Sequence, residues 1–183
     1  MNITVKKGNL ADTKTQVVIL ALCEGEKTFS ELVSIIDQKT GGLLSDLLKS
    51  GDFEARPSQI SVIYTRSLPA KRIALMGLGK KNELNLEKIR NAFAKVMQHL
   101  RGLNIKDAAT TVDWNLLPDK KEKIIAAVAE GAGLGLYQYT PYKTVGRDEF
   151  KEMRQLEIVV EPKDYSVILD LSLIHISEPT RPY

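Results

Sequence analysis

Residues 72–79 read as a strand that ends in two glycines, Gly77 and Gly79, followed by Lys80, and this combination could bind a phosphate group. A strand, a glycine pair and a following helix can place backbone N–H groups under a phosphate. The match is incomplete, because Asn82 stands where a G-x-G-x-x-G motif needs its third glycine, and the sequence is not a G-x-x-x-x-G-K-[ST] loop either. The alternative is a tight strand-to-helix turn that requires positive φ. Gly77, Gly79 and Lys80 are therefore the candidate binding residues, for a phosphate-type turn.

A second glycine-rich stretch, "AEGAGLGLYQYTPYKT", begins at Ala129 and carries Gly131, Gly133 and Gly135. It fails the dinucleotide-binding pattern because of its spacing and because it follows a predicted helix instead of a strand. On a helix, Gly131 and Gly135 lie about one turn apart on the same face. The sequence therefore predicts that this face approaches a neighbouring backbone closely.

Metal, acid–base and nucleophilic chemistry find little support in the sequence. Of the two histidines, His99 falls near the end of a predicted helix and His175 near the end of the chain, and no H-E-x-x-H is present. Cys23 ends an apolar strand with no obvious histidine partner, which favours an inert core thiol over a nucleophile. We predict no catalytic residue, no metal ligand and no cofactor in this chain. Helix capping and solvation are the predicted roles of Asp12, Asp37, Asp46 and Asp52.

Strand-like and helix-like segments alternate along the chain. Strands are predicted around Ile3 and Val5 and at residues 16–22, 59–65, 72–79, 107–113 and 156–161. The first two are expected to be an edge strand beside a central one. Helices are predicted on both sides of a break at Gly41 and Gly42, after an N-cap at Asn85, and from Pro118 onward. The pattern predicts an α/β fold, a three-layer sandwich with a mixed, mostly buried β-sheet flanked by helices.

The composition is that of a globular protein, with 183 residues, 43% hydrophobic, 27% charged and a net charge of +3. Basic and acidic residues are mixed along the chain, so Lys80–Lys81 and the lysines at 120, 121 and 123 are interpreted as solvated faces, with nucleic-acid contact as the alternative. The single cysteine excludes an internal disulfide framework. No apolar run approaches the roughly 18 residues of a membrane span, and no signal-peptide core precedes the first strand. We expect a cytoplasmic protein without membrane contact.

The last residues, "LSLIHISEPTRPY", break the pattern, because they offer neither a helical period nor a cap. They also resemble a peptide translated from sequencing-adapter DNA at the end of an incomplete gene assembly. We therefore expect residues 171–183 to be a non-native tail and exclude them from fold reasoning.

Two regions together resemble the N-terminal domain of the leucyl aminopeptidases, also called cytosol aminopeptidases. The segment "RIALMGLGKKNELNLEKIRNAFAKV" is similar to the family's strand, G-L-G-K turn and helix. The second glycine-rich stretch is similar to the family's A-E-G-x-x-L-G-x-Y-x-[FY]-x-x-Y-K-[ST] segment. The residues in register are Gly131, Gly135, Tyr137, Tyr139, Tyr142 and Lys143.

The resemblance implies a domain with a fold similar to macro domains, in a cytosolic, usually hexameric metalloenzyme that removes N-terminal residues from peptides. The family's two divalent metal ions, zinc or manganese, and its catalytic residues belong to a C-terminal domain recognised by N-T-D-A-E-G-R-L. That motif is absent here, and the AEG at residues 129–131 lacks its flanking letters. The expected organisation is an N-terminal domain at residues 1–161, the start of an interdomain linker at 162–170, and the non-native tail.

The resulting hypothesis is a non-catalytic N-terminal domain of a truncated aminopeptidase, predicted to be inactive alone, whose partners are the missing C-terminal catalytic domain and further copies in a homo-hexamer. The alternative is a binding module, either a macro-like nucleotide pocket at residues 77–81 or a DNA-contacting surface. A third interpretation is a fragment without a function of its own, which exposes an apolar surface where the second domain docks.

Overall fold

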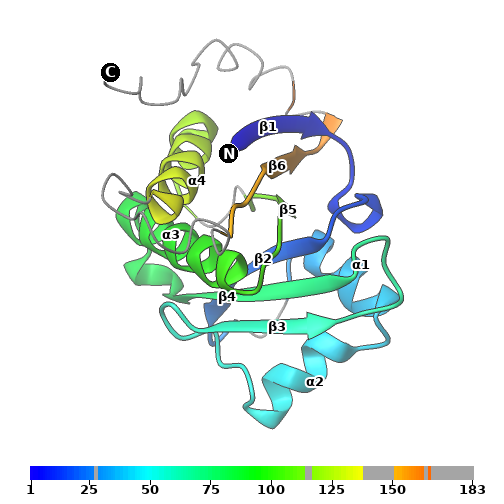
Figure 1. Ribbon diagram of the computed structural model, residues 1–183. Helices are drawn as coiled ribbons and strands as arrows, with labels where there is room; N and C mark the ends of the chain where they lie inside the picture. Colours follow the sequence, from blue (N-terminus) through cyan, green and yellow to red (C-terminus); the bar gives the residue numbers. More distant parts are fainter. Residues whose placement is uncertain (27–28, 114–116, 138–150, 163–164, 166–183) are drawn as a thin grey trace, which may run out of the picture.

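The computed structural model describes residues 1–26, 29–113, 117–137, 151–162 and 165, in which strands and helices alternate (Figure 1). The strands are β1 (Asn2–Lys7), β2 (Val17–Glu24), β3 (Ile60–Tyr64), β4 (Arg72–Lys80), β5 (Asp107–Thr110) and β6 (Gln155–Val160). The α-helices are α1 (Glu31–Lys39), α2 (Leu43–Ser50), α3 (Leu86–Gly102) and α4 (Lys121–Leu136), and short 3-10 helices are η1 (Leu10–Asp12) and η2 (Lys81–Glu83). Tyr139, Tyr142, Lys143 and the predicted tail, with His175, lie outside the described residues.

The six strands form one mixed sheet in the order β1-β6-β5-β2-β4-β3. All neighbours are parallel except the hairpin of β3 and β4, in which Ile60 faces Met76. The prediction that the first strand lies beside the second is wrong. β1 is an edge strand, but it pairs with β6, and both β6 and β5 stand between it and β2. The reason is the length of the connection. Neighbouring parallel strands are joined by a crossover of about a dozen residues or more, usually a helix. Only the short segment that contains η1 lies between β1 and β2.

Helices cover the sheet on both faces, which confirms the three-layer α/β fold (Figure 1). α3 and α4 lie on one face, where Val17, Ala74 and Met76 of the central strands meet the apolar side of α3. On the other face, α1 and α2 pack on Val18 and Ile73 of the same strands. Because strands β2 and β4 are buried on both faces, their sequences are continuous apolar runs rather than alternating ones.

The long helix α3 begins where the sequence predicts. The side chain of Asn85 accepts a hydrogen bond of 2.9 Å from the backbone N–H of Lys88, which confirms Asn85 as its N-cap. By contrast, Pro118 does not open the next helix. α4 begins at Lys121, after an N-cap residue, Lys120, in extended conformation. The fixed φ of proline suits a first helical position but equally suits the turn that precedes it.

A buried carboxylate connects α1 to α2. Oδ1 of Asp37 accepts hydrogen bonds from the backbone N–H groups of Leu44 and Ser45, at 2.8 and 3.1 Å, and Oδ2 accepts one from the Ser45 hydroxyl. These amides belong to the first turn of α2. The N-cap residue of α2 is Gly42, which has no side chain that could accept their hydrogen bonds. Asp37 therefore caps a helix from the neighbouring helix, which confirms its predicted capping role.

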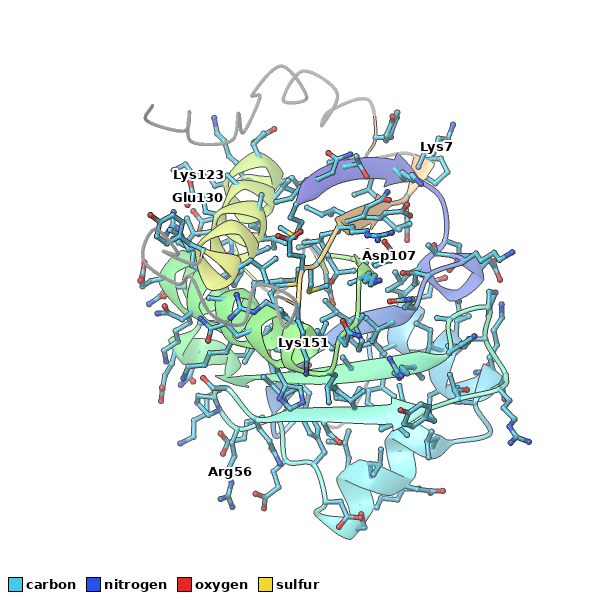
Figure 2. The ribbon with its side chains drawn as sticks, viewed as in Figure 1. Lys7, Arg56, Asp107, Lys123, Glu130 and Lys151 are labelled. Atoms are coloured by element: carbon cyan, nitrogen blue, oxygen red, sulfur yellow. The ribbon has the colours of Figure 1, made fainter. Side chains whose placement is uncertain are left out.

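Charged side chains lie on the surface of several different helices, strands and loops (Figure 2). Lys7 extends from β1, Lys123 and Glu130 from α4, and Lys151 from the segment before β6, where its Nζ donates to the carbonyl of Gly102 at 2.7 Å. Glu130 pairs with Arg90 of α3, so this ion pair joins the two helices on one face of the sheet. The pair is half-exposed, so it contributes little to the stability of the fold.

Candidate functional site

A pocket of about 490 Å³ lies across the carboxyl ends of the parallel strands. Its walls come from the chain after β1, from the end of β2, from the start of α1, and from the segments that follow β5 and β6, while α3 and α4 close it on the opposite side. In open parallel sheets, ligands bind beyond this edge of the strands. A volume between about 300 and 1,000 Å³ is also the usual size of a small-molecule site.

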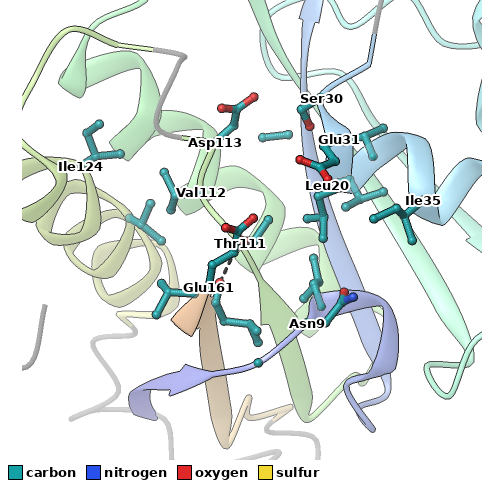
Figure 3. Close-up of a pocket in the computed structure, with 18 of the residues that line it drawn as sticks. Asn9, Leu20, Ser30, Glu31, Ile35, Thr111, Val112, Asp113, Ile124 and Glu161 are labelled. Carbon is teal, nitrogen blue, oxygen red and sulfur yellow. Dashed lines mark hydrogen bonds between the residues drawn. The ribbon is translucent and has the colours of Figure 1, made fainter. Parts of the chain in front are cut away.

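Much of the pocket lining is apolar, and hydrogen bonds between strands fix the segments around it. Leu20, Leu78 and Phe93 are among the buried side chains that line the pocket. The hydroxyl of Thr111 donates to the carbonyl of Val159 at 2.8 Å, which fixes the segment after β5 to β6 (Figure 3). Thr110, fully buried, donates to the carbonyl of Ile19 at 3.3 Å, and this ties the end of β5 to β2. The strand ends that surround the pocket are therefore held in place before any ligand binds.

Three carboxylates line this pocket: Glu31, Asp113 and Glu161. Figure 3 shows Glu31, at the start of α1, and Asp113, after β5, on opposite sides of it. Among the described residues that line it, none is a lysine, an arginine or a histidine. The pocket lining therefore combines apolar side chains with three carboxylates.

The sequence reasoning missed this pocket. The signal was a polar or acidic residue shortly after each of three parallel strands: Asn9 follows β1, Asp113 follows β5 and Glu161 follows β6. Parallel strands bring their carboxyl ends to the same edge of a sheet. The signal could not be used without the strand order, since the first strand was predicted in the wrong place.

The predicted phosphate-type turn, Gly77, Gly79 and Lys80, lies within β4 and at its end, and α3 begins only at Leu86. The backbone N–H groups of Gly77 and Gly79 donate to the carbonyls of Gln59 and Ala55, at 2.8 and 3.0 Å. Gly79 has a φ of 77°, as the alternative of a tight turn requires. Lys80 is exposed. The fold thus uses both glycine amides internally, and phosphate binding at Lys80 stays a prediction.

Residues 129–136 of the second glycine-rich stretch form the C-terminal half of α4, and the predicted close approach is confirmed. A Cβ atom added at Gly131 would lie 2.3 Å from the carbonyl oxygen of Arg90, and one added at Gly135 would lie 2.3 Å from that of Ala94. The two helices therefore touch backbone to backbone. Tyr137, the residue that follows α4, is 66% exposed.

Cys23, near the end of β2, is a buried thiol, as predicted. Burial raises its pKa to about 11, and the negative charge of Glu26 acts in the same direction. The thiolate, which is the reactive form, is then rare at neutral pH.

Modification of Cys23 by a disulfide reagent such as Ellman's reagent should therefore be at least about 100-fold slower at pH 8 in the native protein than in concentrated urea. The sequence has one cysteine, so the released chromophore reports this side chain alone. The folded pKa lies above the ordinary value of 9.0, so the protection holds below pH 9 and weakens as the pH rises toward 11. Equal rates in native and unfolded protein at pH 8 would contradict a buried thiol.

The part of the chain that the structure describes holds no group of three His, Cys, Asp or Glu side chains that could bind a metal ion. His99 is exposed on the last turn of α3. The metal ions implied by the resemblance therefore have no fitting site among these residues. Nor does any helix in the described ranges have the length and apolarity to cross a bilayer.

A sequence model of the N-terminal domain of the cytosol aminopeptidase family matches residues 17–145, which include β2 to α4 and thus most of the fold described above. The chain belongs to the cytosol aminopeptidase family. A probable cytosol aminopeptidase from Alkaliphilus oremlandii is 27% identical over 174 residues, which are 93% of this chain and 34% of that protein. The chain thus spans about a third of the length of the curated cytosol aminopeptidase it matches.

Solved structures agree with this assignment at the level of the fold. A lysine-to-glutamate mutant of tomato leucine aminopeptidase superposes with a TM-score of 0.71 at 18% identity, over 87% of this chain and 32% of that one. A Trypanosoma brucei macrodomain in complex with ADP-ribose superposes with a TM-score of 0.70 at 10% identity, over 93% of this chain and 68% of that one. This cytosol aminopeptidase domain therefore shares the macrodomain fold.

Proposed function

We propose that this chain is the non-catalytic N-terminal domain of a cytoplasmic, metal-dependent aminopeptidase, which removes N-terminal residues from peptides. The catalytic residues and two divalent metal ions, zinc or manganese, would belong to a C-terminal domain that packs against this one, and the intact protein would be a homo-hexamer. In this proposal residues 1–161 are the domain and residues 162–170 begin the linker.

The observation that carries this proposal is the match to the N-terminal domain of the family, combined with a length of about a third of a curated relative. Cys23, the one cysteine of the sequence, is buried and protonated at neutral pH, which does not suit a nucleophile.

The purified chain should not hydrolyse leucine p-nitroanilide, with or without added manganese or zinc, while a full-length cytosol aminopeptidase does so in the same buffer. As a control, the separately expressed catalytic domain of that full-length enzyme is added to the reaction with this chain, to show that the substrate and the metal are functional. Metal-dependent turnover that copurifies with the 183-residue chain would contradict the proposal.

The rival function, nucleotide binding, receives less support from the geometry. The amides of Gly77 and Gly79 are bonded within the fold, and the pocket at the carboxyl ends of the strands is lined by three carboxylates. Phosphate groups bind where backbone amides or basic side chains point at them. For these reasons the aminopeptidase domain is the proposed function.

A further inference from the structure

We propose that the exposed apolar end of α4, made of Gly133, Leu134 and Tyr137, is the surface on which the catalytic domain of the intact protein packs. The inference rests on the proposed function and adds to it the place where the two domains touch. It is carried by the side chains of Leu134 and Tyr137, which are 69% and 66% exposed in this domain. These three residues are called the α4 patch below.

The exposed side of α4 changes character after Glu130. Up to that residue, the exposed positions of the helix are the charged Lys123 and Glu130. Residues 131–136 have the sequence GAGLGL and carry no polar side chain, although Gly133 and Leu134 are exposed. A helix that is apolar all round is normally buried all round. The neighbouring helix α3 shows the usual surface pattern, because its exposed positions before Gly102 are polar: Glu87, Asn91, Lys95, Gln98 and His99.

Contacts within this domain explain the glycines on the inner side of α4 but not the α4 patch. Gly131 and Gly135 lie against the backbone of α3. A Cβ atom added at Gly133, by contrast, would meet no atom within 4 Å. The backbone N–H of Tyr137 donates to the carbonyl of Leu134 at 3.2 Å, so these two residues lie one turn apart. Tyrosine combines an apolar ring with a hydroxyl group and is enriched where proteins pack on one another.

The catalytic domain is the occupant that the family assignment supplies. The chain matches a model of an N-terminal domain, and its matched part is about a third of the curated relative from Alkaliphilus oremlandii. Domains joined in one chain commonly share an interface of about 600–1,500 Å². Exposed apolar side chains that lie together mark such contact surfaces. The α4 patch is therefore expected to meet an apolar surface of the larger domain.

The other large hydrophobic side chains that are exposed in the described residues fit this role less well. Tyr64, on the edge strand β3, is 73% exposed, but the guanidinium of Arg72 lies 4.9 Å from the centroid of its ring. Met1 and Leu103 are less exposed, at 37% and 48%. Among the described residues, only the α4 patch has two such side chains one turn apart.

The test uses the full-length protein, which the proposed function predicts to carry both domains. The photo-cross-linker p-benzoylphenylalanine is introduced in place of Leu134, and cross-linked peptides are identified by mass spectrometry after irradiation. We expect cross-links from position 134 to residues of the catalytic domain. The matched control carries the same cross-linker in place of Tyr64, which is equally exposed but lies on β3, and should give no cross-link to that domain.

A pair of substitutions tests the same contact without a cross-linker. In the 183-residue chain, Leu134→Glu should leave the urea midpoint nearly unchanged, because this side chain is exposed. In the full-length protein it should weaken the packing of the two domains, so trypsin should cut between them about fivefold faster. Tyr64→Glu should leave the rate of this cleavage unchanged. Circular dichroism shows whether both variants are folded.

Several outcomes would overturn the proposal. These are cross-links from position 134 only to residues 1–161, whether of the same chain or of a second copy, no cross-link from position 134 at all, and equal effects of the two substitutions on cleavage. A full-length protein without a second domain would contradict the proposed function as well. An active two-domain enzyme in which position 134 does not cross-link to the catalytic domain would contradict only the contact surface, and the aminopeptidase assignment would stand.

Discussion

Replacing Gly131 or Gly135 with alanine should lower the free energy of unfolding by about 2–3 kcal/mol, although alanine is the better helix former. The added methyl carbon would lie only 2.3 Å from a backbone carbonyl oxygen of α3. Backbone atoms cannot move out of the way as the end of a flexible side chain can. α3 and α4 would have to separate. The measurement is the urea midpoint followed by circular dichroism.

Gly133→Ala is the control for this prediction. Gly133 lies in the same helix between the two, is exposed, and has no atom within 4 Å of an added Cβ. It should raise stability by about 0.5–1 kcal/mol, because alanine restricts the unfolded chain and favours the helix. If all three variants shifted stability in the same direction, the close approach of α3 and α4 would be refuted.

Gly77→Ala should be similarly costly, with a loss of about 3 kcal/mol or a failure to fold. A Cβ atom at Gly77 would lie 2.1 Å from the carbonyl oxygen of Arg56 and 2.6 Å from the carbonyl carbon of Ala55. This segment bends tightly over β4, with Ala55 and Ser58 both at positive φ, 57° and 65°. Such residues remain in a strained conformation only where their surroundings hold them.

Gly8→Ala serves as the control, because its added Cβ would meet only Cγ1 of Val159, at an ordinary 3.8 Å. It should change the unfolding free energy by less than about 1 kcal/mol. The pair also distinguishes two roles of Gly77. A glycine needed only for phosphate approach would tolerate alanine without loss of stability, and that result would contradict the packing role described here.

The sequence predicted most of the elements of this fold but not their neighbours in the sheet. Apolar runs such as "QVVILAL" identify central strands because burial on both faces leaves no alternation, and Asn85 marks the start of α3 through a local hydrogen bond. Strand order depends on pairing between distant residues, and no local signal assigns β6 as the partner of β1.

The candidate functional residues show the same contrast between local features, which the sequence predicts, and contacts between distant segments, which it does not. Gly131 and Gly135 were understood from spacing alone, because two residues one turn apart on a helix share a face wherever that helix packs. The sequence predicts a ligand-binding turn at the glycine pair in β4, but the backbone amides of both glycines donate to the segment that precedes β3. The residues of the acidic pocket come from segments that lie far apart in the chain, and only the fold brings them together.

The pairing of β1 with β6 also affects the order in which this domain can form. Asn2 faces Gln155, so the first strand leaves the ribosome more than 150 residues before its partner exists. Closing a loop of that length costs entropy, and contacts between such distant residues slow folding. Until β6 is made, β1 has no strand beside it and β5 lacks its outer neighbour. The unpaired edges of β1 and β5 can then pair with other chains. The period of greatest aggregation risk in this domain is therefore its own synthesis.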